Sequence, residues 1–237
     1  MHIVSLGALL AGSLFSPLGA APAGWQSLGI EQTVEPMFPP LLLQIGLTEG
    51  EARVAIDTDA NGKLVEWLVV GYTKKEFADS SVVAIRQWNF TPARLGDESV
   101  GTIVELRFYF SAHGVVVSSA NPSDLLEAQT MRMFAGRYTY LPCSGRELDQ
   151  APTPVVTVAP RYGTDLAKRG IGGSVRIDFY IDELGAVRMP CVAAENHGVL
   201  PALAIEALKQ WRFAPPTSRG RAVLVKASEE FRFDNGG

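Results

Sequence analysis

The sequence predicts a chain of two tandem units, each built from strands and helices, because one pattern occurs twice. The segment Trp88–Ala93 (Trp-Asn-Phe-Thr-Pro-Ala) resembles Trp211–Pro216 (Trp-Arg-Phe-Ala-Pro-Pro), and the two tryptophans lie 123 positions apart. The same shift relates six further pairs: Gly50 and Gly173, Asp59 and Asp182, Gly62 and Gly185, Ala84 and Ala207, Phe108 and Phe231, and Phe110 and Phe233. One constant shift over about 60 residues indicates a duplication, which decides how the rest of the chain is divided.

The composition is that of a globular protein large enough for two small domains. Of its 237 residues, 47% are hydrophobic and 19% are charged, so each half can bury a modest core. The net charge is −4 at pH 7, and the sequence contains no long stretch of residues that carry the same charge. A nucleic-acid surface needs a basic stripe, so this balance argues against nucleic acid as a partner.

Each predicted unit begins with a proline-containing segment and a short helix. The proline-containing segments are Val34–Pro40 and Val156–Tyr162. The helix is clearer in the second unit, at Gly163–Arg169, where Gly170–Gly173 ends it as a glycine-rich C-cap would.

A β-hairpin follows in each unit. The turns are predicted at Asp59–Gly62 and Asp182–Gly185, where aspartate and glycine separate β-branched runs. The predicted strands around them are Arg53–Ile56, Leu64–Val70, Ser174–Ile181 and Ala186–Val192.

A second helix and a final strand complete each unit. Apolar residues recur at helical spacing at Phe77, Ala84, Ile85 and Trp88, and again at Leu200, Ala204, Ala207, Leu208 and Trp211. Trp88 and Trp211 are therefore interpreted as core anchors, whereas Trp25 and Trp67 have no counterpart and are better candidates for an exposed contact. The final strands are predicted at Gly101–Phe110 and Arg221–Phe233.

The division of the chain follows from these patterns. We expect a first, more degenerate unit at residues 25–111, a helical connector at 112–147 and a second unit at 148–235. Within the connector, Asn121–Asp124 can cap a helix that runs to about Phe134.

The first 23 residues are predicted to be a secretory signal peptide. An apolar core runs from Ile3 to Phe15, Pro17 interrupts it, and small residues suited to cleavage follow. The basic residues typical of such signals are missing, because the first arginine is Arg53. An uncleaved anchor or a buried helix is the alternative, although the apolar core is short for a bilayer. Export to the periplasm or outside the cell is the expectation.

Two cysteines, Cys143 and Cys191, form the possible disulfide of an exported chain. Two separate buried thiols are the alternative. Neither the spacing of the cysteines nor the surrounding residues suggest a metal site.

Two patterns that resemble functional sites have simpler explanations. Asp57–Gly62 resembles the start of a calcium-binding loop, but the twelfth position is Leu68 instead of glutamate, and a hairpin turn accounts for the pattern. His2, His113 and His197 are not arranged with a nucleophile and an orienting group in either repeat. We therefore expect no enzyme, no metal and no cofactor.

The repeated pattern resembles a known protein family. A Pro-x-(Tyr/Phe)-Pro-like segment, a glycine, a strand ending in Asp-x-x-Gly, an alanine-rich helix ending in Trp-x-Phe-x-Pro, and a strand ending in Phe-x-Phe resemble the C-terminal domain of TonB. Residues 148–234 carry the resemblance best, and residues 25–111 carry a degenerate form that includes Phe38–Pro40.

This resemblance implies an α+β fold, with a small antiparallel sheet and packed helices in each of two tandem TonB C-terminal-like units. It also implies binding of a protein partner, because the TonB domain pairs by strand addition with an extended segment of an outer-membrane receptor. The chain lacks a long proline-rich linker, so a periplasmic binding protein accessory to TonB-dependent transport is the favoured expectation. A membrane-anchored energy transducer and a structural or homodimerising protein are the alternatives.

The final strand of the second unit is the candidate place for partner-strand addition. The region proposed from sequence comprises Val223, Val225, Ala227, Glu229 and Phe231. Charged residues on this strand also fit a solvent-exposed face or a protected edge, and this reading is kept as the alternative.

Overall fold

The computed structural model describes residues 24–119, 136–192 and 198–234. These residues form two compact units, with the division between Leu141 and Pro142. We call residues 24–141 the first unit and residues 142–234 the second unit, and each is described by itself. The predicted signal peptide, the predicted helix ending near Phe134, and both His2 and His197 lie outside the described residues.

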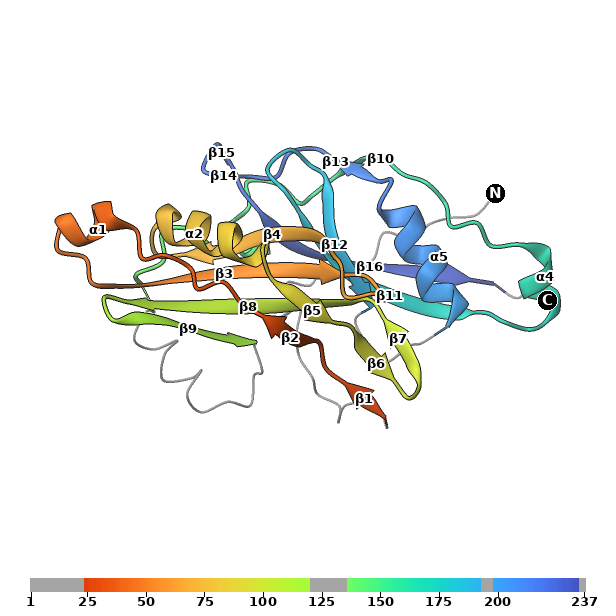
Figure 1. The fold of residues 1–237 in the computed structure, drawn as a ribbon. Helices are drawn as coiled ribbons and strands as arrows, with labels where there is room; N and C mark the ends of the chain where they lie inside the picture. Colours follow the sequence, from red (N-terminus) through yellow and green to blue (C-terminus); the bar gives the residue numbers. More distant parts are fainter. Residues whose placement is uncertain (1–23, 120–135, 193–197, 235–237) are drawn as a thin grey trace. The chain divides into compact units, whose positions relative to one another are not determined.

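The first unit is centred on a four-stranded antiparallel sheet with the order β4-β3-β8-β9. Figure 1 shows β8 lying between β3 and β9, with α2 over the β3–β4 hairpin. Its elements are β1 (Trp25–Gln26), β2 (Gly29–Gln32), α1 (Pro40–Gln44), β3 (Glu49–Thr58), β4 (Leu64–Tyr72), α2 (Lys75–Ile85), β5 (Asn89–Thr91), β6 (Ala93–Leu95), β7 (Glu98–Val100), β8 (Thr102–Ser111) and β9 (Gly114–Ser119). Small sheets β2-β5 and β1-β6-β7 complete it.

The second unit is centred on a three-stranded antiparallel sheet with the order β12-β11-β16. Helix α5 packs on β11 and β12. The elements are η1 (Gly145–Glu147), β10 (Pro154–Val156), α4 (Thr164–Lys168), β11 (Gly173–Ile181), β12 (Val187–Val192), α5 (Val199–Leu208), β13 (Arg212–Phe213), β14 (Thr217–Ser218), β15 (Arg221–Ala222) and β16 (Val225–Phe233). Both units thus combine antiparallel sheets with helices, in keeping with the expected α+β class.

The two Asp-x-x-Gly sequences form the hairpin turns, as predicted. Oδ1 of Asp59 accepts hydrogen bonds from the backbone N–H groups of Asn61 and Lys63, at 2.8 and 2.9 Å. Oδ1 of Asp182 does the same for Leu184 and Ala186, at 3.0 and 2.8 Å. Both turns therefore use their aspartate as a backbone acceptor.

The glycine of each turn is required by a positive φ and by a close approach of the backbone. Gly62 has φ +78°, and a Cβ there would lie 2.2 Å from the carbonyl oxygen of Phe90. Gly185 has φ +81°, and a Cβ there would lie 2.0 Å from the carbonyl oxygen of Phe213. A side chain at either position would force the hairpin away from the segment that follows the second helix.

The two repeated tryptophans are buried core residues, as the helical spacing predicted. Trp88 and Trp211 are 6% and 2% exposed. The indole Nε1 of Trp88 donates to the carbonyl of Val34, and that of Trp211 donates to the carbonyl of Val158, each at 2.8 Å. Each tryptophan thereby fixes the proline-containing segment at the start of its own unit, while its ring fills the core.

Several element boundaries differ from the sequence prediction, and β3 is longer than expected, at Glu49–Thr58 instead of Arg53–Ile56. Two further differences change which strands border the sheets. The connector was expected to begin at residue 112, but Gly114–Ser119 form β9, which pairs along β8 from Leu106 to Ser111. The last strand was expected to run from Arg221 to Phe233, but it is divided into β15 and β16, because Val223 leaves the strand and donates its N–H to Pro216 at 3.0 Å. In both regions, hydrogen bonding to other segments determined where the strands begin and end, and the alternation of residue types did not reveal it.

Candidate functional site

One edge of the second unit's sheet is the outer side of β16, and the other is the outer side of β12. β16 pairs with β11 on one side over its whole length, from Val225 to Phe233. On the other side, the described residues contribute one parallel bridge, between Cys143 and Val225, with the N–H of Cys143 donating to the carbonyl of Leu224 at 2.7 Å. Beyond this point, from Ala227 to Phe233, no strand within the described residues lies against that edge.

The corresponding edge of the first unit is closed. β8 and β16 are related by the 123-position shift, which places Phe108 on Phe231 and Phe110 on Phe233. The outer edge of β8 carries β9, with Phe108 opposite Val117 and Phe110 opposite Val115. The chain that follows β8 therefore occupies, in the first unit, the position that is open in the second.

The structure assigns different roles to the residues of the proposed partner-strand region than the sequence suggested. Val225, Ala227, Glu229 and Phe231 are all buried, because their side chains point to the inner face of β16, toward the core. Val223 lies before the strand. A partner strand would therefore meet the backbone of β16, and of this group only Glu229 carries a polar side chain.

Backbone groups alternate between the two sides of a strand, and this alternation identifies the groups at the open edge. The carbonyl of Leu224 faces the outer side, because it accepts from Cys143. Ser228, Glu230 and Arg232 follow at even spacing and turn their N–H and C=O groups outward. Their side chains lie on the solvent face, where Arg232 and Glu230 form an ion pair at 3.5 Å and Ser228 accepts from Arg176 at 3.0 Å.

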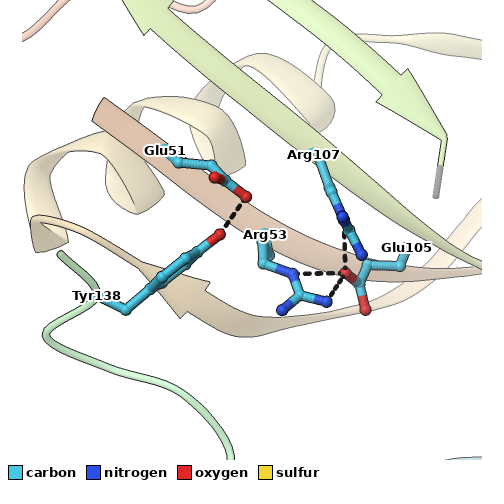
Figure 2. A network of polar contacts seen from close by, with 5 residues as sticks. All are labelled: Glu51, Arg53, Glu105, Arg107 and Tyr138. Atoms are coloured by element: carbon cyan, nitrogen blue, oxygen red, sulfur yellow. Dashed lines mark hydrogen bonds and ion pairs between the residues drawn. The ribbon is translucent and has the colours of Figure 1, made fainter. Parts of the chain in front are cut away.

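The first unit contains a buried polar network that the sequence analysis did not identify (Figure 2). The carboxylate of Glu105 on β8, 4% exposed, accepts from Nε of Arg53 on β3 at 2.6 Å and from Nε of Arg107 at 3.3 Å. Nη2 of Arg53 also donates to it. The hydroxyl of Tyr138, which comes from the segment after β9, donates to Glu51.

This network attaches the connector to the sheet, which we read as a structural role. Burial raises the pKa of Glu51, although the hydrogen bond from Tyr138 and the charge of Arg53 act in the opposite direction. Burial also raises the pKa of Tyr138, and the charge of Glu51 adds to the effect. The sequence signal was the alternation of charged residues at Glu51 and Arg53 and at Glu105 and Arg107. This pattern alone indicates a solvent-exposed strand face, and only the structure shows that a third segment covers it.

A shallow cleft lies at the hairpin end of the first unit, with a volume of about 600 Å³. The guanidinium of Arg86 lies over the indole of Trp67, 5.4 Å from its centroid, and Trp67 is 37% exposed. Trp25 is half-buried in β1. Of the two tryptophans without counterparts, Trp67 thus has the more exposed ring. The cleft is lined by Asn61, Gly62, Lys63, Leu64, Trp67, Arg86, Trp88, Asn89 and Phe90.

The expected Cys143–Cys191 disulfide is absent from the structure. Cys143 lies beside the outer edge of β16, whereas Cys191 lies on β12 and is paired with Asp178 of β11. Strands β16 and β11 stand between them, so about three strand spacings of ~4.8 Å separate the two backbones. A disulfide requires Cα atoms within about 7 Å, so the sheet order excludes the bridge. The described residues also contain no cluster of metal-ligating side chains.

Chemical labelling of the thiols tests the conclusion that Cys143 and Cys191 are not joined by a disulfide. Protein purified and denatured without reductant is expected to react with two equivalents of a thiol reagent, because the two thiols are too far apart to form an intramolecular bridge. A monomer with no reactive thiol before reduction and two after it would show instead that the two residues are joined.

Two comparisons relate the chain to known proteins, and the family match lies in the second unit. Residues 158–234 match the sequence model of the family described as Gram-negative bacterial TonB protein C-terminal. The chain is 32% identical over 77 residues to the protein TonB of Vibrio cholerae serotype O1, an alignment that covers 32% of this chain and 32% of that protein. The similarity thus spans about a third of the length of that relative. No helix within the described residues is both long and apolar enough to span a membrane.

Proposed function

We propose that the protein is an exported, non-enzymatic binding protein whose second unit captures an extended protein segment by strand addition to the outer edge of β16. The observation that carries the proposal is the open edge from Ala227 to Phe233. The similarity of residues 158–234 to the TonB C-terminal domain supports it, since that family points to a protein partner. The partner class that we propose is a segment of an outer-membrane receptor, met in the periplasm.

We further propose that the chain is a tandem duplication in which the first unit has lost the binding edge. The two units place a hairpin, a helix and a final strand in the same order, and their Asp-x-x-Gly turns and buried tryptophans make equivalent contacts. β9 then closes in the first unit the edge that remains open in the second. On this view, the first unit does not itself bind a segment.

A proline at Glu230 tests the proposed edge. The N–H of Glu230 faces outward and is not part of the β11 pairing, so Glu230→Pro is expected to leave the fold intact and remove a donor to an added strand. With fluorescent 15-residue peptides that tile the periplasmic segments of outer-membrane receptors, Glu230→Pro should weaken the best binder by at least about tenfold. Fluorescence anisotropy measures the affinity, and thermal unfolding checks the fold.

Glu230→Ala is the matched control, because it removes the same side chain and keeps the backbone donor. Wild-type affinity for this variant is expected. Equal affinities of the proline and alanine variants would place binding elsewhere on the protein.

A homodimer is the second candidate, because an open edge can also pair with the same edge of another copy. Sedimentation of the wild-type chain distinguishes the two. A dimer that Glu230→Pro converts to a monomer would favour self-association as the role of β16, whereas a monomer at micromolar concentration would favour capture of a foreign segment.

A further inference from the structure

A buried carboxylic acid lies on the inner face of β16. Glu229 is 8% exposed, and the residue opposite it on β11 is the fully buried Ile177. Its neighbours on the same face of the strand are Ala227 and Phe231, both apolar and 5% exposed. Within the described residues, the Oε1 atom of Glu229 is buried and has no hydrogen-bond partner. A carboxyl group is expensive in such a place unless it is paired.

In the first unit, the position that corresponds to Glu229 is occupied by an apolar core residue. The 123-position shift places Glu229 on Leu106, which is 2% exposed and belongs to the apolar core. The open side of Leu106 is occupied by β9, whose Ser119 is its cross-strand partner. Therefore, where the edge is closed the core position is apolar, and where the edge is open the position carries an acid.

A strand added to β16 would bring one side chain next to this acid. Directly opposed residues of paired strands have Cβ atoms about 4.5–5.5 Å apart and face the same side of the sheet. The residue opposite Glu229 would thus have the register position on β16 that Ser119 has opposite Leu106 on β8. The other charged groups on β16 are Lys226, Glu230 and Arg232, and alternation places all three on the opposite face from Glu229. Lys226 lies over the ring of Tyr180, and Glu230 pairs with Arg232, so none of them satisfies Glu229.

We infer that Glu229 is a specificity-determining residue that selects partner segments carrying lysine or arginine opposite it. This inference rests on the proposed strand addition and names the chemistry of the segment. An ammonium or guanidinium group would give the buried carboxylate the hydrogen bonds and the opposite charge that it lacks. An acidic residue at the same position would be rejected, because Glu229 and Glu230 would both repel it.

The state of the acid without a partner fits this role. Burial, with a further contribution from the charge of Glu230, raises the pKa of Glu229 to about 7. A cation opposite it would favour the ionised form, so binding of a lysine-containing segment should release a proton near neutral pH. The facing residue on β11 is apolar and supplies no competing charge.

A double-mutant cycle between protein and peptide tests the inference. The best-binding receptor peptide is resynthesised with lysine at each position in turn, and with norleucine, which has a similar shape without charge, at the same positions. Each peptide is titrated at pH 8 against wild type, Glu229→Gln and Glu229→Leu. The leucine variant is expected to fold, because Leu106 fills the corresponding site in the first unit.

We expect one position at which lysine binds wild type about tenfold more tightly than norleucine, and at which this preference is lost in both variants. Proton release, measured near pH 7 by calorimetry in buffers of different ionisation enthalpy, should accompany only the wild-type complex, because at this pH a large part of Glu229 is protonated before binding. If peptides bind but no position couples to residue 229, the selection by Glu229 is wrong and strand addition stands. If no peptide binds wild type or either variant, both the proposed strand addition and the proposed selection by Glu229 are wrong.

Discussion

Replacing Glu105 by glutamine is expected to destabilise the first unit by about 3–5 kcal/mol, because this one buried carboxylate pairs with the buried Arg107 and the partly buried Arg53. Glu105 accepts from Arg53 at 2.6 Å and from Arg107 at 3.3 Å, and it is only 4% exposed. Glutamine preserves the size of the side chain, so the loss is electrostatic and not that of a cavity. A whole domain is stable by about 5–15 kcal/mol, so the variant should unfold at much lower urea concentration.

The matched control is the surface ion pair between Lys75 and Asp79, one helical turn apart in α2. Their atoms are 2.6 Å apart, as close as the buried pair, but both side chains are more than half exposed. Asp79→Ala is therefore expected to cost no more than about 0.5 kcal/mol. Similar midpoints for the two variants in urea denaturation, followed by circular dichroism, would mean that the network of Figure 2 is not buried in solution.

The second large effect is a gain of stability at high pH when Glu229 is replaced by glutamine. The pKa of Glu229 is raised from 4.5 to about 7, so the folded state binds a proton more tightly than the unfolded state. The neutral acid carries no penalty below pH 4.5, stability falls as the pH rises from 4.5 to about 7, and the loss is complete above 7. The full difference corresponds to about 3 kcal/mol, as an upper value.

The measurement is urea denaturation of wild type and Glu229→Gln at pH 5 and pH 8. We expect the variant to be more stable than wild type at pH 8, by up to about 3 kcal/mol, and the advantage to shrink strongly at pH 5. Glu206→Gln on α5 is the control, since that side chain is exposed, is not a cause of the Glu229 shift and should change little at either pH. An advantage of the same size at both pH values would show that packing of residue 229, and not its ionisation, sets the difference.

The repeat also held information about Glu229 that its residue type did not. Alone, a glutamate in a strand indicates a solvated face, and this reading was kept as an alternative for β16. The shift that aligns Phe108 with Phe231 aligns Leu106 with Glu229, and thus places the acid at a position where the first unit has a core leucine. Comparing the positions that the 123-residue shift aligns is therefore the sequence signal that identifies a buried acid.

The network around Glu105 had no comparable signal. Its residues come from β3, β8 and the segment that contains Tyr138, and Tyr138 is 87 positions from Glu51 in the chain. Alternating charges on a strand mean solvent exposure unless something covers that face. What covers a face is decided by contacts between segments far apart in the sequence, and local patterns do not encode them.

The sequence by itself determined the elements whose geometry depends on near neighbours. The Asp59 and Asp182 turns, the helix positions of Trp88 and Trp211, and the strands around them follow from side-chain period, turn chemistry and φ preference, all of which act within a few residues. Only the tertiary structure decided the sheet order. That order places β9 on one edge, leaves the edge of β16 open, separates Cys143 from Cys191, and buries Glu229. Strands that are far apart in the sequence pair through main-chain hydrogen bonds, and these groups are the same in nearly every residue, so local residue patterns do not identify the partner.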